Sequence, residues 1–406
     1  MNQQQRQLIE PIREWQASML KHTTEACNIN SGSYNHQGIA AVTTYFDELF
    51  ADICDQQERI TLPPLQTINN EGKVLEHPIA EAALYRIRPE APTQILCTGH
   101  TDTVFPKASS FQTCWQENNR LRGPGVADMK GGLVVLYHAL KAIHLSPFAQ
   151  QLGFTILLSP DEEIGSPRSA QHLTYWAKQC DVGMVYEPSL EDGTLAGARK
   201  GSGNFDIVVK GKASHAGRDF FAGRNAVVVA ANISQQLAAM SNEATGITVN
   251  IGRIDGGGAV NVVPDNAVIR FNIRIEHAHQ QQPILDAINT MIHAVATQND
   301  VTAQLHGRFG RPPKPMDAKH QALFEQLKYC GELIGVPIAW RKTGGCCEGN
   351  NLAAAGLPTI DTLGVRGGAI HSEDEFMCID SLVERAQLSA LLMSRMHNYA
   401  PKDSLC

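Results

Sequence analysis

The stretch TQILCTGHTDTV, residues 93–104, decides the fold of this chain. A short apolar run breaks into polar residues, which is typical of a buried strand that delivers a loop. The same plan recurs at 152–166 (LGFTILLSPDEEIGS) and at 181–189 (DVGMVYEPS), where acids again follow an apolar run. Helical periodicity at 132–144 separates the first two runs. Strands that alternate with helices predict an α/β domain with a mostly parallel sheet, whose ligands gather at the carboxyl ends of the strands.

The pattern changes after about residue 200. The expected elements there follow the order β-α-β-β-α-β of a ferredoxin-like sandwich. They are a strand at 205–216, a helix at 225–240, strands at 245–257 and 266–275, a helix at 281–296 and a strand at 300–309. Loop-like joints, LAGARKGSG and GRPPKPMD, stand before and after this segment. We therefore expect a discontinuous catalytic domain, residues 1–199 and 312–406, into which a second domain, 200–311, is inserted.

Composition narrows the possible partners. The 406 residues are 43% hydrophobic and 18% charged, and the formal net charge is −7. A chain with no excess of cations is a poor general ligand for nucleic acid or anionic lipid. No apolar run is long enough to span a membrane, and the N-terminus lacks the pattern of a secretory signal. Ten cysteines without a C-x-x-C pair indicate free thiols and a cytoplasmic protein.

Polar residues at the expected strand ends are candidates for metal binding. His100 and Asp102 are two apart in extended chain, so the carboxylate can lie behind the imidazole and orient it. Asp128 lies in the glycine-rich segment GPGVADMKGG at the start of a helix. Each residue also has an ordinary explanation: a capped turn with a surface histidine, or a helix N-cap.

Further acids and one histidine complete the set. Glu162 and Glu163 are adjacent, so one can bind a metal while the other acts as a general base. Glu187 ends the third strand, and His371 lies in the loop GGAIHSEDEF. Taken singly, a solvated acidic turn or a surface histidine would explain them. Together, two histidines and three carboxylates suit two divalent cations, and mixed N and O ligands favour zinc, with cobalt or manganese as alternatives.

Seven motifs in this order resemble a zinc metallopeptidase family. The motifs are GHTDTV, GPGVADMKGG, SPDEEIGS, YEPS, KASHAG, NVVPD and GGAIHSEDE. The family contains glutamate carboxypeptidase, acetylornithine deacetylase, succinyl-diaminopimelate desuccinylase and aminoacylase-1, and the resemblance is greatest to the glutamate carboxypeptidase branch. It runs from about residue 80 to the C-terminus.

The resemblance implies a role for each matched residue. It places His100, Asp128 and Glu187 on one zinc ion, and Asp128, Glu163 and His371 on the other. Glu162 becomes the general acid and base, and Asp102 the residue that orients His100. The inserted domain becomes a lid that also forms a homodimer. His215 reaches the partner's site and stabilises the oxyanion, and Asn261 and Arg274 hold the substrate, Arg274 through its carboxylate.

One segment departs from the family pattern. TGGCCEGNN, residues 343–351, has Glu348 where an Asp is usual, and Cys346 and Cys347 where small or hydroxyl residues are common. Lys342 lies where the carboxypeptidase branch can have an Arg. The two thiols could be reactive beside a metal or could simply be buried. These departures bear on the substrate more than on metal binding.

The sequence therefore predicts a metal-dependent amide hydrolase. Its substrate is expected to be a small peptide, from which it releases a C-terminal amino acid such as glutamate. Removal of an acyl group from an N-acyl amino acid is the alternative within the same chemistry. A non-catalytic metal-binding protein is a remote third possibility, which the presence of Glu162 and of every expected ligand disfavours.

Overall fold

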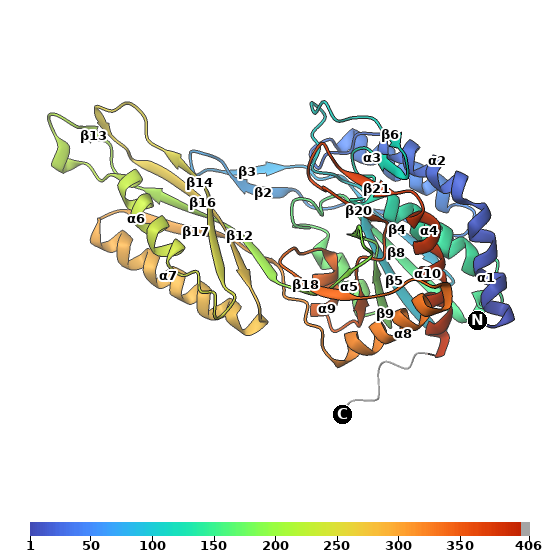
Figure 1. Cartoon of the computed structure of the whole chain (residues 1–406). Helices are drawn as coiled ribbons and strands as arrows, with labels where there is room; N and C mark the ends of the chain where they lie inside the picture. Colours follow the sequence, from blue (N-terminus) through green and yellow to red (C-terminus); the bar gives the residue numbers. More distant parts are fainter. Residues whose placement is uncertain (399–406) are drawn as a thin grey trace.

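The computed structural model describes residues 1–398, and a six-stranded sheet forms the centre of its larger part (Figure 1). In order across the sheet, the strands are β1 (Gln56–Ile60), β4 (Ala82–Ile87), β8 (Leu152–Ser159), β5 (Thr93–His100), β9 (Val182–Val185) and β19 (Thr359–Ile360). β8, β5, β9 and β19 run parallel to one another, whereas β4 is antiparallel to both of its neighbours. The predicted α/β fold with a mostly parallel sheet is confirmed.

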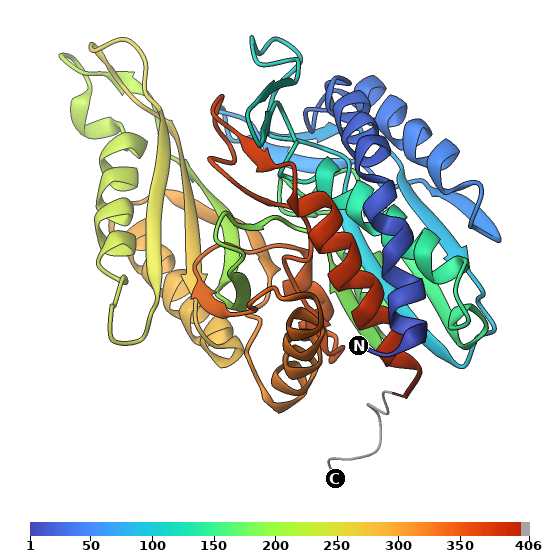
Figure 2. The ribbon, with the colours of Figure 1, turned by 45° about the vertical axis from the view of Figure 1, so that its right-hand side comes forward.

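Helices cover both faces of this sheet (Figures 1 and 2). On β5, Ile95 and Cys97 pack into one core layer and Leu96 into the other. The first layer holds α1 (Gln3–Glu14), α2 (Gln16–Cys27), α3 (His36–Phe50), α4 (Lys130–His144), α8 (Ala318–Ile334) and α10 (Ser381–Arg395), and the second holds α5 (Ala170–Ala177) and α9 (Glu348–Ala354). Because both faces are buried, β8 is apolar throughout rather than alternating.

A second, four-stranded antiparallel sheet forms the inserted domain. In chain order its elements are β12 (Gly201–Lys210), α6 (Ala226–Ala238), β14 (Thr248–Gly256), β16 (Asn266–Ile275), α7 (Gln281–Gln298) and β17 (Thr302–Arg311). The sheet order β14-β16-β12-β17 gives the expected β-α-β-β-α-β arrangement. This sheet and its two helices share a separate hydrophobic core, drawn from residues 205–309, and the division at residues 200 and 311 stays a prediction.

Alternation along these strands gives the inserted sheet two different faces. Phe205, Ile207 and Phe271 point into the core that α6 and α7 cover. Their neighbours in sequence, such as Asn204 and Asn272, point to the opposite face. That face carries no helix and looks toward the catalytic domain (Figure 1).

Several shorter strands and turns lie outside the two large sheets. A hairpin of β2 (Leu65–Ile68) and β3 (Val74–His77) reaches from the catalytic domain toward the inserted sheet (Figure 1). A smaller five-stranded sheet consists of β10 (Ser189–Leu190), β20 (Arg366–Gly368), β21 (Phe376–Cys378), β7 (Arg120–Arg122) and β6 (Trp115–Glu117). The remaining strand pairs are β11 (Leu195–Arg199) with β18 (Trp340–Thr343) and β13 (Ser214–His215) with β15 (Val262–Val263). Four 3₁₀ turns cover Ala149–Gln151, Phe220–Ala222, Ala278–Gln280 and Met396–Asn398.

Within residues 1–398, none of the helices has both the length and the apolar character that a membrane crossing requires.

Candidate active site

The five predicted metal ligands lie together at the carboxyl ends of the central strands. β8, β5 and β9 are adjacent and parallel, so the residues that follow them meet at one edge of the sheet. Two groups form there, and in each group the ligand atoms lie within 4.8 Å of one another. One group contains His100, Asp128 and Glu187, and the other contains Asp128, Glu163 and His371.

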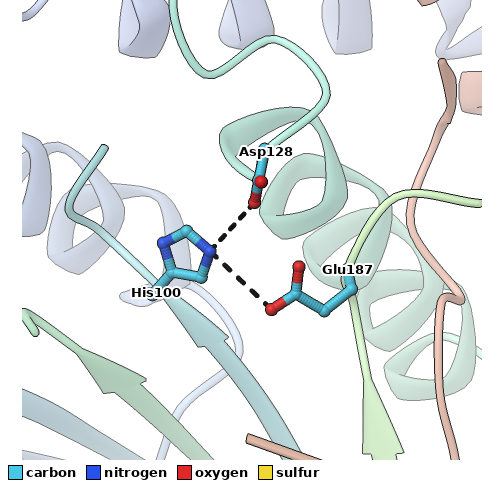
Figure 3. Close-up of side chains that lie close together, drawn as sticks. All are labelled: His100, Asp128 and Glu187. Carbon is cyan, nitrogen blue, oxygen red and sulfur yellow. Dashed lines mark hydrogen bonds and ion pairs between the residues drawn. The ribbon is translucent and has the colours of Figure 1, made fainter. Parts of the chain in front are cut away.

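The first group converges on a single imidazole nitrogen (Figure 3). Nε2 of His100 lies 3.1 Å from Oδ1 of Asp128 and 3.8 Å from Oε1 of Glu187. His100 is the last residue of β5, and Glu187 follows β9, while Asp128 comes from the loop directly before α4. All three residues are buried.

The second group uses the other oxygen of Asp128. Nε2 of His371 lies 3.3 Å from Oδ2 of Asp128 and 3.2 Å from Oε2 of Glu163. Each carboxylate oxygen of Asp128 therefore belongs to a different group. That geometry fits a carboxylate that bridges two cations, which is the role that the resemblance implies for Asp128.

The electrostatics of the cluster also fit cations. The ion pairs of its three carboxylates within the described chain are made with His100 and His371, and not with Lys or Arg. Burial and the charge of Asp128 raise the pKa of Glu163 to about 8 and raise that of Glu187 well above its ordinary range. Buried carboxylates crowded in this way need positive charge nearby, which two divalent cations would supply. The residues present therefore fit a two-metal centre.

Asp102 connects two parts of the site. Nδ1 of His100 lies 2.9 Å from the main-chain oxygen of Asp102 and 3.5 Å from its carboxylate. The carboxylate also accepts hydrogen bonds from the main-chain N–H groups of Glu162 and Glu163, at 3.1 and 3.2 Å, and from Oγ of Ser33. Asp102 thus lies behind His100 as expected, and in addition fixes the turn that carries the adjacent glutamates.

Glu375 has a structural role that the sequence did not reveal. In the sequence it is one of three acids that follow His371 in the loop GGAIHSEDEF. In the structure it is fully buried, and its carboxylate accepts main-chain N–H bonds from Gly125, Ala127 and Asp128 at 3.1, 2.9 and 3.0 Å. It therefore holds the loop that presents the bridging ligand. Only its place beside apolar Phe376, at the start of a strand, could have signalled burial.

Arg311 is a second residue that the sequence did not identify. It ends β17 in the predicted joint, and Nη2 lies 2.5 Å from Oε1 of Glu162. Nη1 donates to Oδ1 of Asn351 at 2.8 Å, and the side chain is buried. The proposed base is thereby in contact with the inserted domain's last strand. Nothing in the segment GRPPKP distinguishes this arginine from a linker charge.

The segment 343–351 lies against Arg274. The guanidinium of Arg274 donates to Sγ of Cys346 and, through Nε, to Oδ1 of Asn272 at 2.9 Å. Cys347 is buried and donates to Oδ2 of Asp361 at 3.1 Å, and burial raises the pKa of its thiol well above the ordinary value. Burial and a raised pKa both favour the buried, packed thiol over the reactive one for Cys347. Glu348 is also buried, which raises its pKa to about 8.

The remaining predicted residues lie away from the metal ligands of this chain. His215 and the strand next to Asn261 pair at the far tip of the inserted domain, where β13 is labelled in Figure 1. The main-chain N–H of Ala216 donates to the oxygen of Asn261 at 2.9 Å. Lys342 is half-exposed and pairs with Glu276 rather than entering the site.

Comparisons with known proteins show which family and which relatives the chain resembles. A family model described as peptidase family M20/M25/M40 matches residues 96–395. Carboxypeptidase G2 of Pseudomonas sp. (strain RS-16) is 25% identical over 95% of this chain and 91% of its own length. A succinyl-diaminopimelate desuccinylase of Pseudoalteromonas translucida is 28% identical over 70% of this chain and 79% of its own length.

Solved structures share the fold. A metallo-carboxypeptidase from Sulfolobus solfataricus superposes with a TM-score of 0.74 at 15% identity, over 94% of this chain and 99% of its own. A dinuclear metal-binding peptidase from Bacillus subtilis superposes with a TM-score of 0.65 at 14% identity, over 95% of this chain and 99% of its own.

Proposed function

The chain belongs to peptidase family M20/M25/M40 and is a metal-dependent amide hydrolase, and on this premise we propose that it releases a C-terminal amino acid from a small peptide. The observation that carries the proposal is the pair of ligand groups that share Asp128, with Glu162 beside them. Similarity to carboxypeptidase G2 over nearly the whole chain supports cleavage next to the C-terminal residue, and glutamate is a candidate product.

The two ligand groups would hold two divalent cations. Zinc suits their mixed nitrogen and oxygen donors, and cobalt or manganese could replace it. Bound there, the cations would supply a water activated to a pKa of about 7 and would polarise the scissile carbonyl. Asp102 supports the site from behind by fixing both His100 and the turn of Glu162.

Glu162 is the proposed general acid and base. Arg311 binds its Oε1, so Oε2 is the oxygen that can take the proton from the attacking water. The same carboxyl group then delivers that proton to the departing amine. Because Arg311 ends the last strand of the inserted domain, the position of that domain affects the orientation of the base.

The inserted domain is the proposed lid and dimer contact. His215 and Asn261 lie too far along its tip to serve their own site, so we assign them to the site of a partner subunit, where His215 stabilises the oxyanion and Asn261 holds the substrate. Exposed apolar residues beside them support a partner contact: Phe221 is 91% exposed, and Val260 is fully exposed. Arg274 stays at the base of the domain, where it would bind the substrate carboxylate.

A deacylase acting on N-acyl amino acids is the second candidate. Similarity to succinyl-diaminopimelate desuccinylases favours it, because those relatives are 24–29% identical over half or more of this chain. The metal centre and base serve both reactions equally. No disulfide joins cysteines within residues 1–398, which supports a reducing, cytoplasmic location in either case.

A hydrolysis screen tests the proposed function. The metal-loaded protein is incubated with a panel of dipeptides and a panel of N-acyl amino acids, and bound metal is measured on the same preparation. We expect two metal ions per chain and faster hydrolysis of peptides. Faster hydrolysis of N-acyl amino acids would establish the deacylase, and a two-metal protein that cleaves neither class would contradict the proposal.

A further inference from the structure

A cavity of about 710 Å³ lies between the two domains. Its walls are the polar face of the inserted sheet, the β2–β3 hairpin and the segment 164–168 that follows the two adjacent glutamates. Arg311, which binds Glu162, also lines it, so the cavity begins beside the proposed base. We call this space the interdomain chamber.

The hairpin closes the far end of the chamber. Nη2 of Arg270 donates to the main-chain oxygen of Ile68 and to Oδ1 of Asn70, both at 3.0 Å. Nζ of Lys210 donates to the main-chain oxygen of Glu71 at 2.6 Å. These bonds connect the hairpin to β12 and β16, so the hairpin forms a fixed wall of the chamber, which opens to solvent on another side.

The floor of the chamber is a polar row. Strand pairing sets Asn204 opposite Asn272, and Asn272 opposite Asn250, across three strands. Nδ2 of Asn272 donates to Oδ1 of Asn204 at 2.7 Å. On the other side of β12, Asn204 pairs with Arg308 of β17. Amide side chains in such a row favour a polar ligand over an apolar one.

The charges that line the chamber are unbalanced. Four arginines line it against one carboxylate, Asp206. Arg311 is paired with Glu162, and Arg270 with Asp255 and Asp206. The other two arginines, Arg168 and Arg308, form no ion pair with a carboxylate of the described chain.

Arg168 and Arg308 donate to main-chain oxygens, those of Pro64 and Pro167. Among the ion pairs of residues 1–398, neither of these two guanidinium groups is matched with a carboxylate. Two guanidinium groups without a carboxylate partner on the wall of the chamber, Arg168 half-buried and Arg308 exposed, are suited to bind an anion, because Arg forms charge-assisted bonds to carboxylates.

We propose that Arg168 and Arg308 form an anion subsite for a carboxylate on the acyl side of the substrate. This inference rests on the proposed function and extends it by naming a substrate class. Arg274, assigned to the carboxylate of the departing amino acid, is outside the chamber lining, so the chamber is left for the other half of the substrate.

The strand geometry sets a length for that half. Arg308 and Arg311 are three residues apart on β17 with a register shift between them, so their Cα atoms are at most about 10 Å apart. A carboxylate bound by Arg308 is therefore expected at a distance on the order of 10 Å from the base. The subsite suits an extended acyl group or a peptide with a distal acid, and a short acyl group would not reach.

Matched substrates test the subsite. The amino acid released fastest in the hydrolysis screen is acylated with dicarboxylic acids of four, six and eight carbons, and with the monocarboxylic acids of equal length. We expect kcat/KM for the dicarboxylic member to exceed that of its neutral partner by about tenfold or more at six to eight carbons. Hydrolysis of the neutral series without any preference at any length would overturn the subsite and leave the proposed function standing.

Variants locate the effect. In the double variant Arg168→Gln and Arg308→Gln, we expect the dicarboxylic preference to disappear, while neutral substrates and metal content stay unchanged. The double variant Arg6→Gln and Arg13→Gln, at two exposed arginines of α1 outside the chamber, is the matched control for loss of two charges. An unchanged preference in the double variant would refute the assignment.

Binding provides a test that does not need turnover. Free octanedioate is titrated into the wild type and the double variant by calorimetry. We expect binding to the wild type that weakens about tenfold in the double variant. No binding to the wild type, or equal binding to both proteins, would overturn the subsite even if the protein hydrolysed nothing in the screen.

Discussion

Glu375 offers a direct test of how the loop before α4 is held. Its carboxylate accepts main-chain N–H bonds from Gly125, Ala127 and Asp128 in a fully buried position. Glu375→Ala leaves these three groups without their acceptor. Each buried N–H that loses its partner costs about 1–3 kcal/mol, so the total is about 3 kcal/mol or more.

The conservative variant separates the three bonds. Glu375→Gln keeps Oε1, which accepts from Ala127 and Asp128, but its amide N–H faces the N–H of Gly125. One hydrogen bond is therefore lost, which lowers the free energy of unfolding by about 1–3 kcal/mol. Because the loop presents Asp128 to both metal sites, we also expect metal affinity to fall by about 10–100-fold in Glu375→Ala, and less in Glu375→Gln.

Two measurements check this prediction. Chemical unfolding of the metal-free proteins gives the change in stability, and competition with a chelator gives the metal affinity. Glu373→Gln is the control, because Glu373 is an exposed acid in the same loop. Its carboxylate accepts a hydrogen bond from Oγ of Ser110. Wild-type metal affinity and stability in Glu375→Ala would refute the account of this loop.

Three further predictions concern metal binding, the base and the dimer. In the metal-free protein the pKa of Glu163 is about 8 and that of His371 about 10, so this pair holds protons at neutral pH that metal binding must release. Metal affinity should therefore rise with pH up to about pH 10, where His371 has also lost its proton, as calorimetry in several buffers will show, and a pH-independent affinity would contradict this. Arg311→Met should lower kcat by at least about tenfold at unchanged metal content, because the base loses its partner; an unchanged kcat would remove Arg311 from that role. Phe221→Ser should weaken a dimer seen by sedimentation and lower activity at low protein concentration, since His215 acts across the contact, whereas a fully active monomer would exclude that arrangement.

Much of the site was predictable because it depends on local pattern. Each ligand-bearing strand is buried on both faces, so its sequence is a mostly apolar run. A polar residue follows the run at its end, as at His100 and Glu187. Parallel neighbours then bring those ends to one edge. The two-faced inserted sheet was likewise visible as alternation along residues 266–275.

What the sequence could not give depends on contacts between distant segments. Arg311 meets Glu162 from 149 positions away, and Glu375 meets Asp128 from 247 positions away. Neither residue differs locally from an ordinary linker or surface charge. The β2–β3 hairpin was missed because its residues are mostly exposed or half-buried, which leaves no hydrophobic period to detect.

The central claim is that Glu162 is the base of a two-metal centre bridged by Asp128. The most direct measurement compares the metal content and turnover of the wild type and Glu162→Gln, prepared and loaded in parallel. We expect two metal ions per chain in both proteins and a loss of turnover of about 10²–10⁴-fold in the variant. Wild-type turnover in Glu162→Gln, or a wild type that is fully active with a single metal ion, would contradict it.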